Sequence, residues 1–323
     1  MSIKIIKAGL QATIQDTGRY GFRSIGIGSG GAMDLFAVRV ANYLTGNGEN
    51  DAVIELNFPA PEIGFQQNAV MSLTGADFSP VCDDHPVKMW EPFFVKEGSL
   101  LQFKQPVNGS KAYLAVTGGW EADEWLGSRS THLTVGAGGH LGRALQKNDI
   151  VLFKEKMQSF AGKLPCMDVS PQIIEKIYRP KNCIRCVASV EWNLLSNMSQ
   201  QFFINDTFGI SLQSDRIGYR LKGTGLALQN HVEIISSAVD EGTIQLLPDG
   251  NLIVLTAAHQ TTGGYPRIAS VIKADLPKFA QLKPGDSFNF KMISVKEAED
   301  ELISMMQYLD ELKIFCSETL YKC

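Results

Sequence analysis

The chain consists mostly of short apolar runs separated by Gly, Pro, Asn and Asp, a pattern that predicts many short β-strands. Closely spaced strands of this length favour sheets or barrels over a doubly wound fold. In the first half the predicted strands are residues 3–7, 52–56, 69–74, 100–103, 112–116 and 150–153, and in the second half they are residues 183–189, 201–204, 242–246, 252–255, 268–272 and 287–293.

Helical patterns are few. Residues 34–44 have apolar side chains at helical spacing, with Asp34 as a natural N-cap and Gly46 just beyond the last turn. Residues 295–315 form the longest helical pattern and begin with acidic side chains, which the helix dipole favours there. Residues 171–177 are a third candidate. We therefore predict a mainly β chain with a few helices.

The length of 323 residues and a hydrophobic fraction of 44% are those of a globular protein large enough for two domains. The polar stretch 154–171, which contains Gly162 and Pro165, is the best candidate for a linker. It predicts an N-terminal β-rich domain over residues 1–160 and a C-terminal one over residues 161–323, the latter with the C-terminal helix.

The net charge of −4 provides no global attraction for nucleic acid or for an anionic membrane. No apolar run approaches the ~20 residues that a membrane-spanning helix needs. The first seven residues alternate like a strand and lack the apolar core of a signal peptide. We expect a cytoplasmic protein without nucleic-acid or membrane partners.

The six cysteines and five histidines do not form a ligand set. Cys183 and Cys186 match a single CxxC pattern inside a predicted strand, without a second pair at zinc spacing, so buried thiols are favoured over metal or redox chemistry. No metal site is predicted. The roles of Cys316, Cys323 and the C-terminal tail stay open.

Residues 15–23 combine an amide, a carboxylate, two guanidinium groups and two glycines. One interpretation is a turn that an Asp–Arg pair stabilises. The other is an anion clamp built on Arg19 and Arg23, because guanidinium groups bind carboxylate or phosphate through two hydrogen bonds. Residues 214–220 repeat this chemistry, which suggests that the two segments form one polar pocket.

Two glycine-rich loops invite comparison with phosphate-binding motifs. Residues 26–31 match GxGxxG and precede the helix predicted from Asp34, and Glu55 follows at the end of a strand. The loop is preceded by polar residues rather than by an apolar strand, so dinucleotide binding is disfavoured, although anion binding at the helix start stays possible. Residues 136–139 follow hydroxyl side chains and could hold an oxyanion.

Residues 260–266 lie between two apolar runs and combine hydroxyl, amide and phenol groups with paired glycines. A simple hairpin needs only two or three turn residues. Glycines let the backbone approach a ligand closely. The segment is therefore predicted to line a site, with Gln260, Thr261 and Thr262 positioning a substrate.

Eight short sequence motifs occur together and in this order, at residues 15–21, 31–34, 73–76, 113–119, 127–131, 214–220, 248–250 and 260–266. In this combination the chain resembles the KipA / allophanate hydrolase subunit 2 family, also called the biotin-dependent carboxyltransferase-like family. The resemblance covers about residues 3–295. It implies two cyclophilin-like β-barrel subdomains.

The resemblance also implies an activity: one subunit of an ATP-dependent 5-oxoprolinase, which opens 5-oxo-L-proline to L-glutamate with ATP hydrolysis. The implied partners are two further subunits, one KipI-like and one LamB/YcsF-like, with ATP bound by the assembled complex. Two alternatives stay open. One is a KipA-like regulator of a KipI-like histidine-kinase inhibitor, and the other is the carboxyltransferase component of a biotin-dependent, urea-type carboxylase. Biotin is not expected on this chain, because no lysine has a convincing biotinylation context.

Several residues follow as candidates. Possible catalytic carboxylates are Asp16, Glu55 and Asp215. Candidates for binding substrate or anion are Gln15, Arg19, Arg23, Thr74, Gly75, Ser130, Thr131, Gly138, Gly139, Ser214, Arg216, Tyr219, Gln260, Thr261, Thr262, Gly263, Gly264 and Tyr265.

The chain departs from the family pattern at two positions. Ala258 stands where relatives commonly have an acid, and His132 stands where they often have Asp. We therefore assign no catalytic acid near residues 260–266.

Overall fold

A computed structural model describes residues 2–155, 167–230 and 232–320. The chain divides into two compact units. The first comprises residues 1–19, 30–171 and 307–323, and the second comprises residues 20–29 and 172–306. The central part of the predicted linker, residues 156–166, lies outside the described residues.

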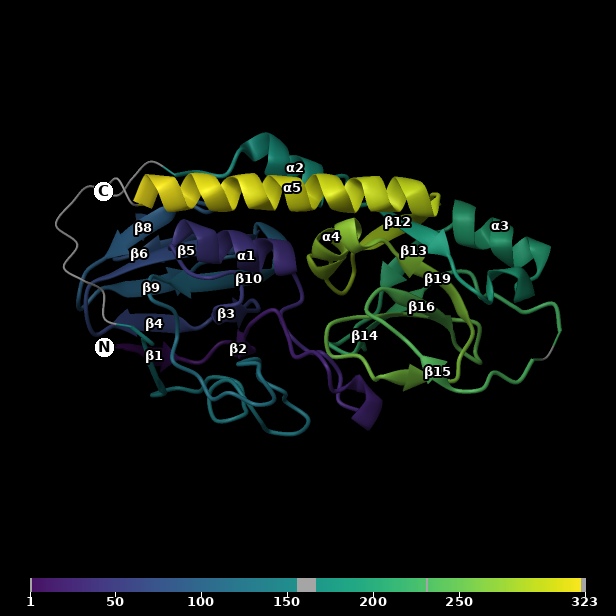
Figure 1. The fold of residues 1–323 in the computed structure, drawn as a ribbon, viewed down its shortest axis with the longest axis horizontal. Helices are drawn as coiled ribbons and strands as arrows, with labels where there is room; N and C mark the ends of the chain where they lie inside the picture. Colours follow the sequence, from purple (N-terminus) through teal and green to yellow (C-terminus); the bar gives the residue numbers. More distant parts are fainter. Residues whose placement is uncertain (1, 156–166, 231, 321–323) are drawn as a thin grey trace. The chain divides into compact units, whose positions relative to one another are not determined.

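The first unit contains two sheets (Figure 1). The six-stranded sheet has the order β11 (Ile150–Leu152), β1 (Ser2–Lys7), β4 (Glu62–Phe65), β9 (Leu100–Phe103), β6 (Pro80–Cys82) and β7 (His85–Pro86). The five-stranded sheet has the order β2 (Ala12–Gln15), β3 (Val53–Leu56), β10 (Asn108–Val116), β5 (Ala69–Asp77) and β8 (Pro92–Val95). All the pairings found in these two sheets are antiparallel.

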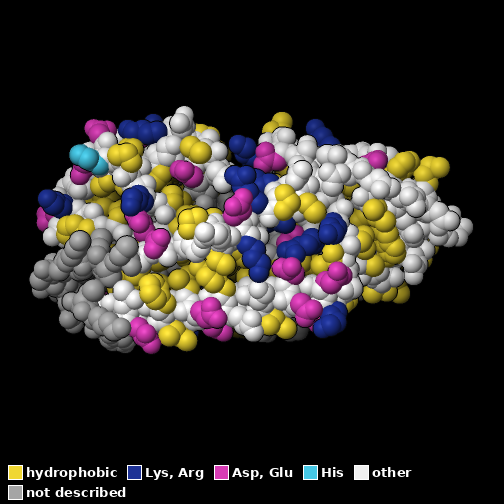
Figure 2. Space-filling model, turned by 90° about the horizontal axis from the view of Figure 1, so that it is seen from above, with side chains coloured by type: hydrophobic (Ala, Val, Ile, Leu, Met, Phe, Trp, Pro, Cys, Tyr) yellow, Lys and Arg dark blue, Asp and Glu magenta, His cyan; other side chains and the backbone are white. Residues whose placement is uncertain are grey.

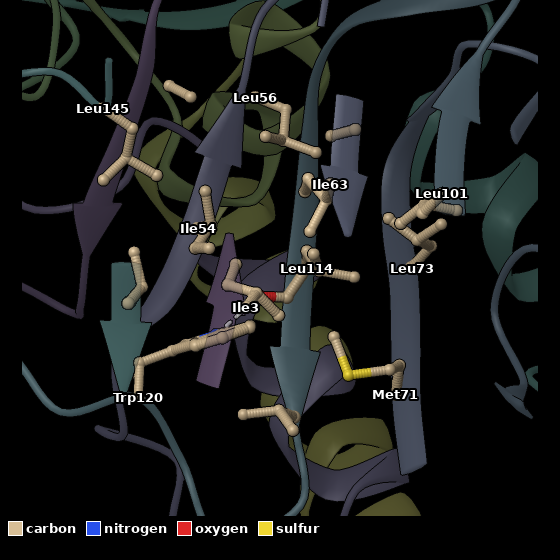
Figure 3. Close-up of a cluster of buried hydrophobic side chains, with 14 of the residues drawn as sticks. Ile3, Ile54, Leu56, Ile63, Met71, Leu73, Leu101, Leu114, Trp120 and Leu145 are labelled. Carbon is tan, nitrogen blue, oxygen red and sulfur yellow. Dashed lines mark hydrogen bonds between the residues drawn. The ribbon is translucent and has the colours of Figure 1, made fainter. Parts of the chain in front are cut away.

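Side chains from both sheets form one hydrophobic core (Figure 3). Ile3 of β1 and Leu101 of β9 come from the first sheet, and Leu73 of β5 and Leu114 of β10 from the second; all four are fully buried. Trp120 also belongs to this core, and its indole Nε1 donates to the Leu114 carbonyl at 3.1 Å. A core of this kind follows from strands that direct alternate side chains to one face.

Helix α1 (Leu35–Leu44) covers the other face of the five-stranded sheet (Figure 1). Because strand side chains alternate, Ser72 and Thr74 of β5 face the helix rather than the core. Their hydroxyls donate at 2.8 Å to the carbonyls of Ala41 and Ala37. The predicted N-cap is confirmed, since the Asp34 carboxylate accepts from the Ala37 N–H.

The second unit is built around a closed barrel. Its strand order is β12 (Cys183–Ala188), β19 (Arg267–Val271), β16 (Thr243–Leu246), β17 (Leu252–Leu255), β14 (Gly218–Lys222), β13 (Thr207–Ile210) and β20 (Ser287–Met292). Parallel pairing of β20 with β12 closes the barrel. A separate ribbon pairs β15 (Ser237–Ala238) with β18 (Thr262–Gly263).

Aromatic side chains pack together in the second unit. The rings of Phe203 and Phe290 stack at 4.7 Å between centroids, and Phe288 meets Phe290 edge to face at 5.0 Å. Phe279 extends the cluster to Tyr219 at 5.2 Å. Such pairs add stabilisation to the burial of their large apolar surfaces.

The remaining helices are α2 (Pro171–Tyr178), α3 (Asn197–Asn205), α4 (Leu276–Ala280) and α5 (Val295–Leu320). The prediction of helices at residues 171–177 and 295–315 is confirmed, with α5 longer than expected. The predicted strand at residues 201–204 is wrong because these residues lie in α3, which Ser196 caps by accepting from the Ser199 N–H at 3.1 Å. The run of apolar side chains there resembles a strand, but burial has helical spacing, since the buried residues of α3, Ser199 and Phe203, are four positions apart.

The predicted mainly β fold with a few helices is confirmed. None of the helices among the described residues is long and apolar enough to cross a membrane. Helix α5 is long but charged, with an ion pair between Lys296 and Asp300 at 3.5 Å. The face shown in Figure 2 has basic side chains next to acidic ones, so its charges are mixed rather than of one sign.

Candidate functional site

Asp16 connects the end of β2 to the loop at residues 128–130 in the first unit. Its carboxylate accepts from the Gly18 N–H at 2.8 Å and from the Arg129 N–H at 2.5 Å. The hydroxyls of Ser128, at 2.7 Å, and of Ser130 also donate to it. Asp16 is nearly buried, and these donors satisfy its oxygens. The carboxylate is therefore placed to hold this loop.

Arg19 is the charged group that this loop surrounds. The residue is only 2% exposed, and its Nη2 donates to the Ser130 carbonyl at 2.7 Å. Burial lowers the pKa of Arg19, and the nearby Asp16 charge opposes that shift. A guanidinium keeps its proton in proteins, so Arg19 is a buried cation.

Two nitrogens of Arg19 lack a hydrogen-bond acceptor among the described residues. Within the part of the chain that the structure describes, Nε and Nη1 are buried and have no partner. The Nε carries one N–H and the Nη1 carries two, so three donors are available. Buried polar groups are usually satisfied, and an exception of this size in a charged group indicates a place for an anion.

Two glycines approach this cation closely. A Cβ on Gly30 would lie 2.8 Å from Arg19 Nη1, and one on Gly138 would lie 2.5 Å from the Ser130 carbonyl oxygen. Both glycines have a left-handed backbone, with φ of 60° and 70°. A side chain at either position would therefore be strained and would displace the groups around Arg19.

Trp125 and His132 complete the surroundings of Arg19. The guanidinium carbon lies 4.8 Å from the centroid of the Trp125 ring, and His132 meets that ring edge to face at 5.7 Å. Burial, and then the Arg19 charge, lower the pKa of His132. The Val135 N–H donates to its Nδ1 at 3.3 Å, so the neutral ring carries its proton on Nε2. We call Asp16, Arg19, Trp125, Ser130 and His132 the Arg19 cluster.

Gln15 and Thr131 lie beside the cluster. Gln15 Nε2 donates to Thr13 Oγ1 at 2.9 Å and to the Thr131 carbonyl at 3.4 Å. Its Oε1 is buried and has no hydrogen-bond partner among the described residues. The Thr131 hydroxyl donates to the Ile14 carbonyl at 2.9 Å and so fixes the loop against β2.

Other candidates in the first unit have structural contacts. Glu55 is buried, and its Oε2 accepts from the Met33 N–H at 2.9 Å and from the Tyr113 hydroxyl at 3.0 Å, which anchors the chain before α1. Thr74 contacts α1 through its hydroxyl. Gly75 has a φ of 78° within β5. Gly139 packs on Thr131, whose Oγ1 would be 1.9 Å from an added Cβ.

Arg23 belongs to the second unit, although only four positions separate it from Arg19. Its guanidinium donates to the Val239 carbonyl and, at 3.2 Å, to the Asp240 carboxylate. The two arginines therefore have different surroundings. The loop at residues 26–31 follows a short 3-10 helix (Arg23–Ile25) rather than a strand.

Most of the predicted segment 214–220 builds a turn before β14. The Asp215 carboxylate accepts from the N–H groups of Ile217 and Gly218 at 2.8 and 3.2 Å. The Ser214 hydroxyl accepts from the backbone N–H of Arg220 at 3.0 Å. Tyr219 is 5% exposed and packs in the aromatic cluster. These residues fix the strand that presents Arg220.

The predicted segment 260–265 forms β18 and the loops on either side of it. Thr261 accepts from the Val239 N–H at 3.2 Å through its carbonyl. His259 is buried, and its Nδ1 donates to the Gln260 carbonyl at 2.6 Å. Burial lowers the pKa of His259. Gly264 has an exposed backbone, and an added Cβ would meet Ser236 Oγ at 3.1 Å.

A pocket of about 460 Å³ lies in the second unit. Its lining consists of Ile217, Arg220, Gln245, Leu247, Pro248, Asp249, Ile253, Gln260 and Tyr265. Two of the predicted segments, 214–220 and 260–266, therefore meet at one cavity, although of their predicted site residues only Gln260 and Tyr265 line it. Arg216, in the first of these segments, is fixed through its backbone: its carbonyl accepts from the Thr256 hydroxyl at 2.7 Å.

Sequence reasoning did not select several residues that the structure places at these sites. Trp125 contacts Arg19 from a loop that contains no site motif of its own. Gln245 is a buried polar residue in an apolar strand, which is a signal that could have identified it. Arg220 belongs to the predicted segment 214–220 but is not among its predicted site residues.

The described residues contain no group of three His, Cys, Asp or Glu side chains placed to hold a metal ion. Cys183 and Cys186 lie three positions apart in β12, so their side chains point to opposite faces of the strand. Burial raises the pKa of the Cys186 thiol, which is the neutral form expected for a thiol in a core.

Comparison with known proteins matches residues 25–292 to the family model described as carboxyltransferase domain, subdomain A and B. A protein from Haemophilus influenzae that is named as the C subunit of 5-oxoprolinase is 35% identical, with 98% of this chain and 99% of that protein covered. A protein of the same name from Escherichia coli is 36% identical, with 96% and 97% covered.

Solved structures extend the comparison to larger proteins. The crystal structure of the K. lactis urea amidolyase matches 96% of this chain with a TM-score of 0.86 and 27% identity. This chain spans only 20% of that protein, so the likeness concerns one part of it. Together with the family model and the two bacterial relatives, it shows that the chain belongs to the carboxyltransferase domain, subdomain A and B, family.

Proposed function

We propose that this protein is the C subunit of an ATP-dependent 5-oxoprolinase, which opens 5-oxo-L-proline to L-glutamate together with two partner subunits. The observation that carries the proposal is the match to two relatives of that name, at 35% and 36% identity. Each match extends over nearly the whole of both proteins, so it concerns the full length of that subunit rather than one shared domain.

The chemistry of the reaction fits the Arg19 cluster. Opening an unstrained lactam places negative charge on the amide oxygen, and fixed N–H donors stabilise that charge. ATP, bound by the assembled complex, supplies the activation of the amide. The three N–H groups of Arg19 that have no acceptor in the described part of the chain are donors of the required kind. We propose that Arg19 stabilises an anionic group in the reaction.

The carboxylates of the chain are proposed to position other groups. Asp16 and Glu55 already accept several hydrogen bonds, and Asp215 accepts two backbone N–H groups in a turn. These hydrogen bonds support a positioning role, and Asp16 accepts hydrogen bonds at both of its oxygens. The two proposed partners, one KipI-like and one LamB/YcsF-like, would then supply the remaining catalytic groups.

Coexpression tests the proposal. The protein is produced together with its KipI-like and LamB/YcsF-like partners, and glutamate release from 5-oxo-L-proline is measured with and without ATP. We expect ATP-dependent release that requires all three proteins. Undiminished release after omission of this one would reject the proposed role.

Carboxyl transfer is a second candidate, because the family description and the fit to the urea amidolyase structure favour it. This function would need a biotin carboxylase and a biotin carrier from other chains. Transfer of a carboxyl group from a carboxylated biotin carrier to urea, dependent on this protein, would support it. The same assay without urea is the control.

A further inference from the structure

The pocket in the second unit has one apolar and one polar part. Ile217, Leu247, Pro248 and Ile253 contribute apolar surface. The polar part contains a guanidinium and two side-chain amides, from Arg220, Gln245 and Gln260. Its volume of about 460 Å³ lies within the usual range for small-molecule sites.

Arg220 supplies an available positive charge. In β14 it alternates with the buried residues Tyr219 and Leu221, so its side chain points away from the barrel interior. Its guanidinium has no hydrogen bond or ion pair with any described residue. Hydrogen bonds from Asn251, and to a smaller extent the Arg220 charge, lower the pKa of the neighbouring Asp249. Both Asp249 oxygens accept from Asn251, at 3.0 and 2.8 Å, and no ion pair of this carboxylate with Arg220 is found among the described residues.

The two amides differ in how firmly they are held. Gln245 is 1% exposed, and its Nε2 donates to the Tyr265 carbonyl at 3.4 Å. A Cβ on Gly263 would lie 2.5 Å from that Nε2, so the glycine makes room for the Gln245 amide. Gln260 is exposed at the pocket, while its backbone carbonyl is fixed by His259.

We propose that this pocket binds a small molecule that carries both a carboxylate and a planar amide. Arg220 pairs with the carboxylate, since guanidinium groups bind carboxylates through two hydrogen bonds. A primary amide side chain both donates and accepts, so Gln245 and Gln260 complement an amide of the ligand. The apolar part accommodates the ligand's methylene groups.

5-oxo-L-proline belongs to this class, and its choice as the first probe rests on the proposed function. An acyclic ureido acid such as N-carbamoylglycine also carries a carboxylate and a planar amide. It is the probe for the alternative function, carboxyl transfer to urea. The site and its chemistry follow from the pocket itself and apply to both.

Calorimetric titration of the full chain, without its partners, tests the site. The probes are 5-oxo-L-proline, N-carbamoylglycine and 2-pyrrolidinone, which is a lactam without a carboxylate. We expect saturable binding of at least one of the two acids and affinity at least ~10-fold weaker for 2-pyrrolidinone, because a charge-assisted pair is lost. The acid that binds more tightly identifies the source of the ligand.

Two variants remove one positive charge each from the exposed face of β14. Arg220→Ala should weaken binding of the acid at least ~10-fold, and should leave binding of 2-pyrrolidinone unchanged. Lys222→Ala is the matched control, because Lys222 is exposed on the same strand but does not line the pocket. It should change the affinity less than ~2-fold.

Failure to bind either acid, or equal losses for Arg220→Ala and Lys222→Ala, would overturn the proposal. A loss of 2-pyrrolidinone binding as large as that of the acid would also contradict it. The proposed function can fail while the site is confirmed. This is the outcome if the acid binds through Arg220 but the assembled 5-oxoprolinase does not need this protein. Conversely, if the three-protein enzyme is active but this protein binds neither acid, the proposed function is supported and the proposed site is rejected.

Discussion

The guanidinium carbon of Arg19 lies 4.8 Å from the centroid of the Trp125 ring. Such a contact offsets part of the cost of removing the cation from water, but it provides no lone pair for the N–H groups. Arg19 Nε and Nη1 are therefore held without an acceptor among the described residues. This arrangement is costly for stability alone, and it supports the proposed role of Arg19 in binding an anion.

Arg19→Met should separate activity from stability. The change removes the donors and should lower glutamate release by the assembled enzyme ~100-fold or more. The free energy of unfolding should change by less than ~1.5 kcal/mol, because the uncompensated N–H groups disappear together with the Ser130 hydrogen bond. Steady-state kinetics and urea unfolding measure the two effects. A large loss of stability with activity retained would show that Arg19 is structural.

Asp16→Asn, unlike Arg19→Met, should act mainly on stability. It removes the negative charge near a buried cation and replaces one acceptor oxygen by a donor facing N–H and O–H groups. We expect a decrease in the free energy of unfolding of ~2–4 kcal/mol. Asp84→Asn is the control: the Asp84 side chain is 92% exposed, so its substitution should cost less than ~0.5 kcal/mol. Similar values for the two variants would contradict the assigned role of Asp16.

The glycine loop next to the cluster allows a test by geometry. Gly139 and Gly136 have similar φ angles, 65° and 72°, but an added Cβ meets Thr131 Oγ1 at 1.9 Å only at Gly139. Gly136→Ala should cost only the left-handed strain of ~1–2 kcal/mol. Gly139→Ala should cost at least ~1 kcal/mol more, because of the additional overlap. Equal unfolding midpoints for the two variants would show that the loop does not pack on Thr131 in this way.

The raised pKa of Glu241 predicts that the stability of the folded protein depends on pH. Burial, and then the Asp240 charge, raise the pKa of Glu241 to about 8, while Arg216 and Lys273 oppose the shift. The folded state then binds the proton more tightly than the unfolded state, whose pKa is near 4.5. The stabilisation is fully present below pH 4.5 and is lost as the pH rises through 8.

The slope contributed by one such group is at most ~1.4 kcal/mol per pH unit. Urea unfolding between these pH values measures it, and Glu241→Gln should flatten the profile because the amide does not titrate. A profile of the same slope in the variant would exclude Glu241 as its source.

Thr262 tests the expected role of the segment 260–266 in positioning substrate. Thr262 is exposed in β18, so Thr262→Val should leave the fold intact. We expect a decrease in kcat/KM of ~10-fold in the assembled enzyme, through loss of a hydroxyl hydrogen bond to substrate. Circular dichroism and copurification with the partner proteins are the controls. Normal turnover by a folded variant that binds its partners would contradict this role.

Local signals predicted much of the fold. Asp34 was recognised as an N-cap because capping depends on residues only a few positions apart. Residues 201–204 form a helix although their sequence predicts a strand, because an apolar run does not distinguish a short helix from a strand; the Ser196 cap is the local signal for the helix.

The sites were predictable only in part. Residues 15–23 and 260–266 were recognisable from their polar composition. The burial of Arg19 was not, since it depends on the Ser130 carbonyl, 111 positions away in the chain, and on the Trp125 ring. Composition predicts a binding role for Ser214 and a catalytic one for Asp215, and the structure adds that both side chains hold a turn. Sequence does not show which polar groups the backbone itself will use.

The most direct test of the proposed function is a titration of the purified protein into a fixed amount of its KipI-like and LamB/YcsF-like partners, with glutamate release from 5-oxo-L-proline measured in the presence of ATP. The proposal predicts release that rises with added protein and saturates at a fixed ratio to the partners, with Arg19→Met reaching a much lower plateau. Release that is independent of the added protein would contradict it.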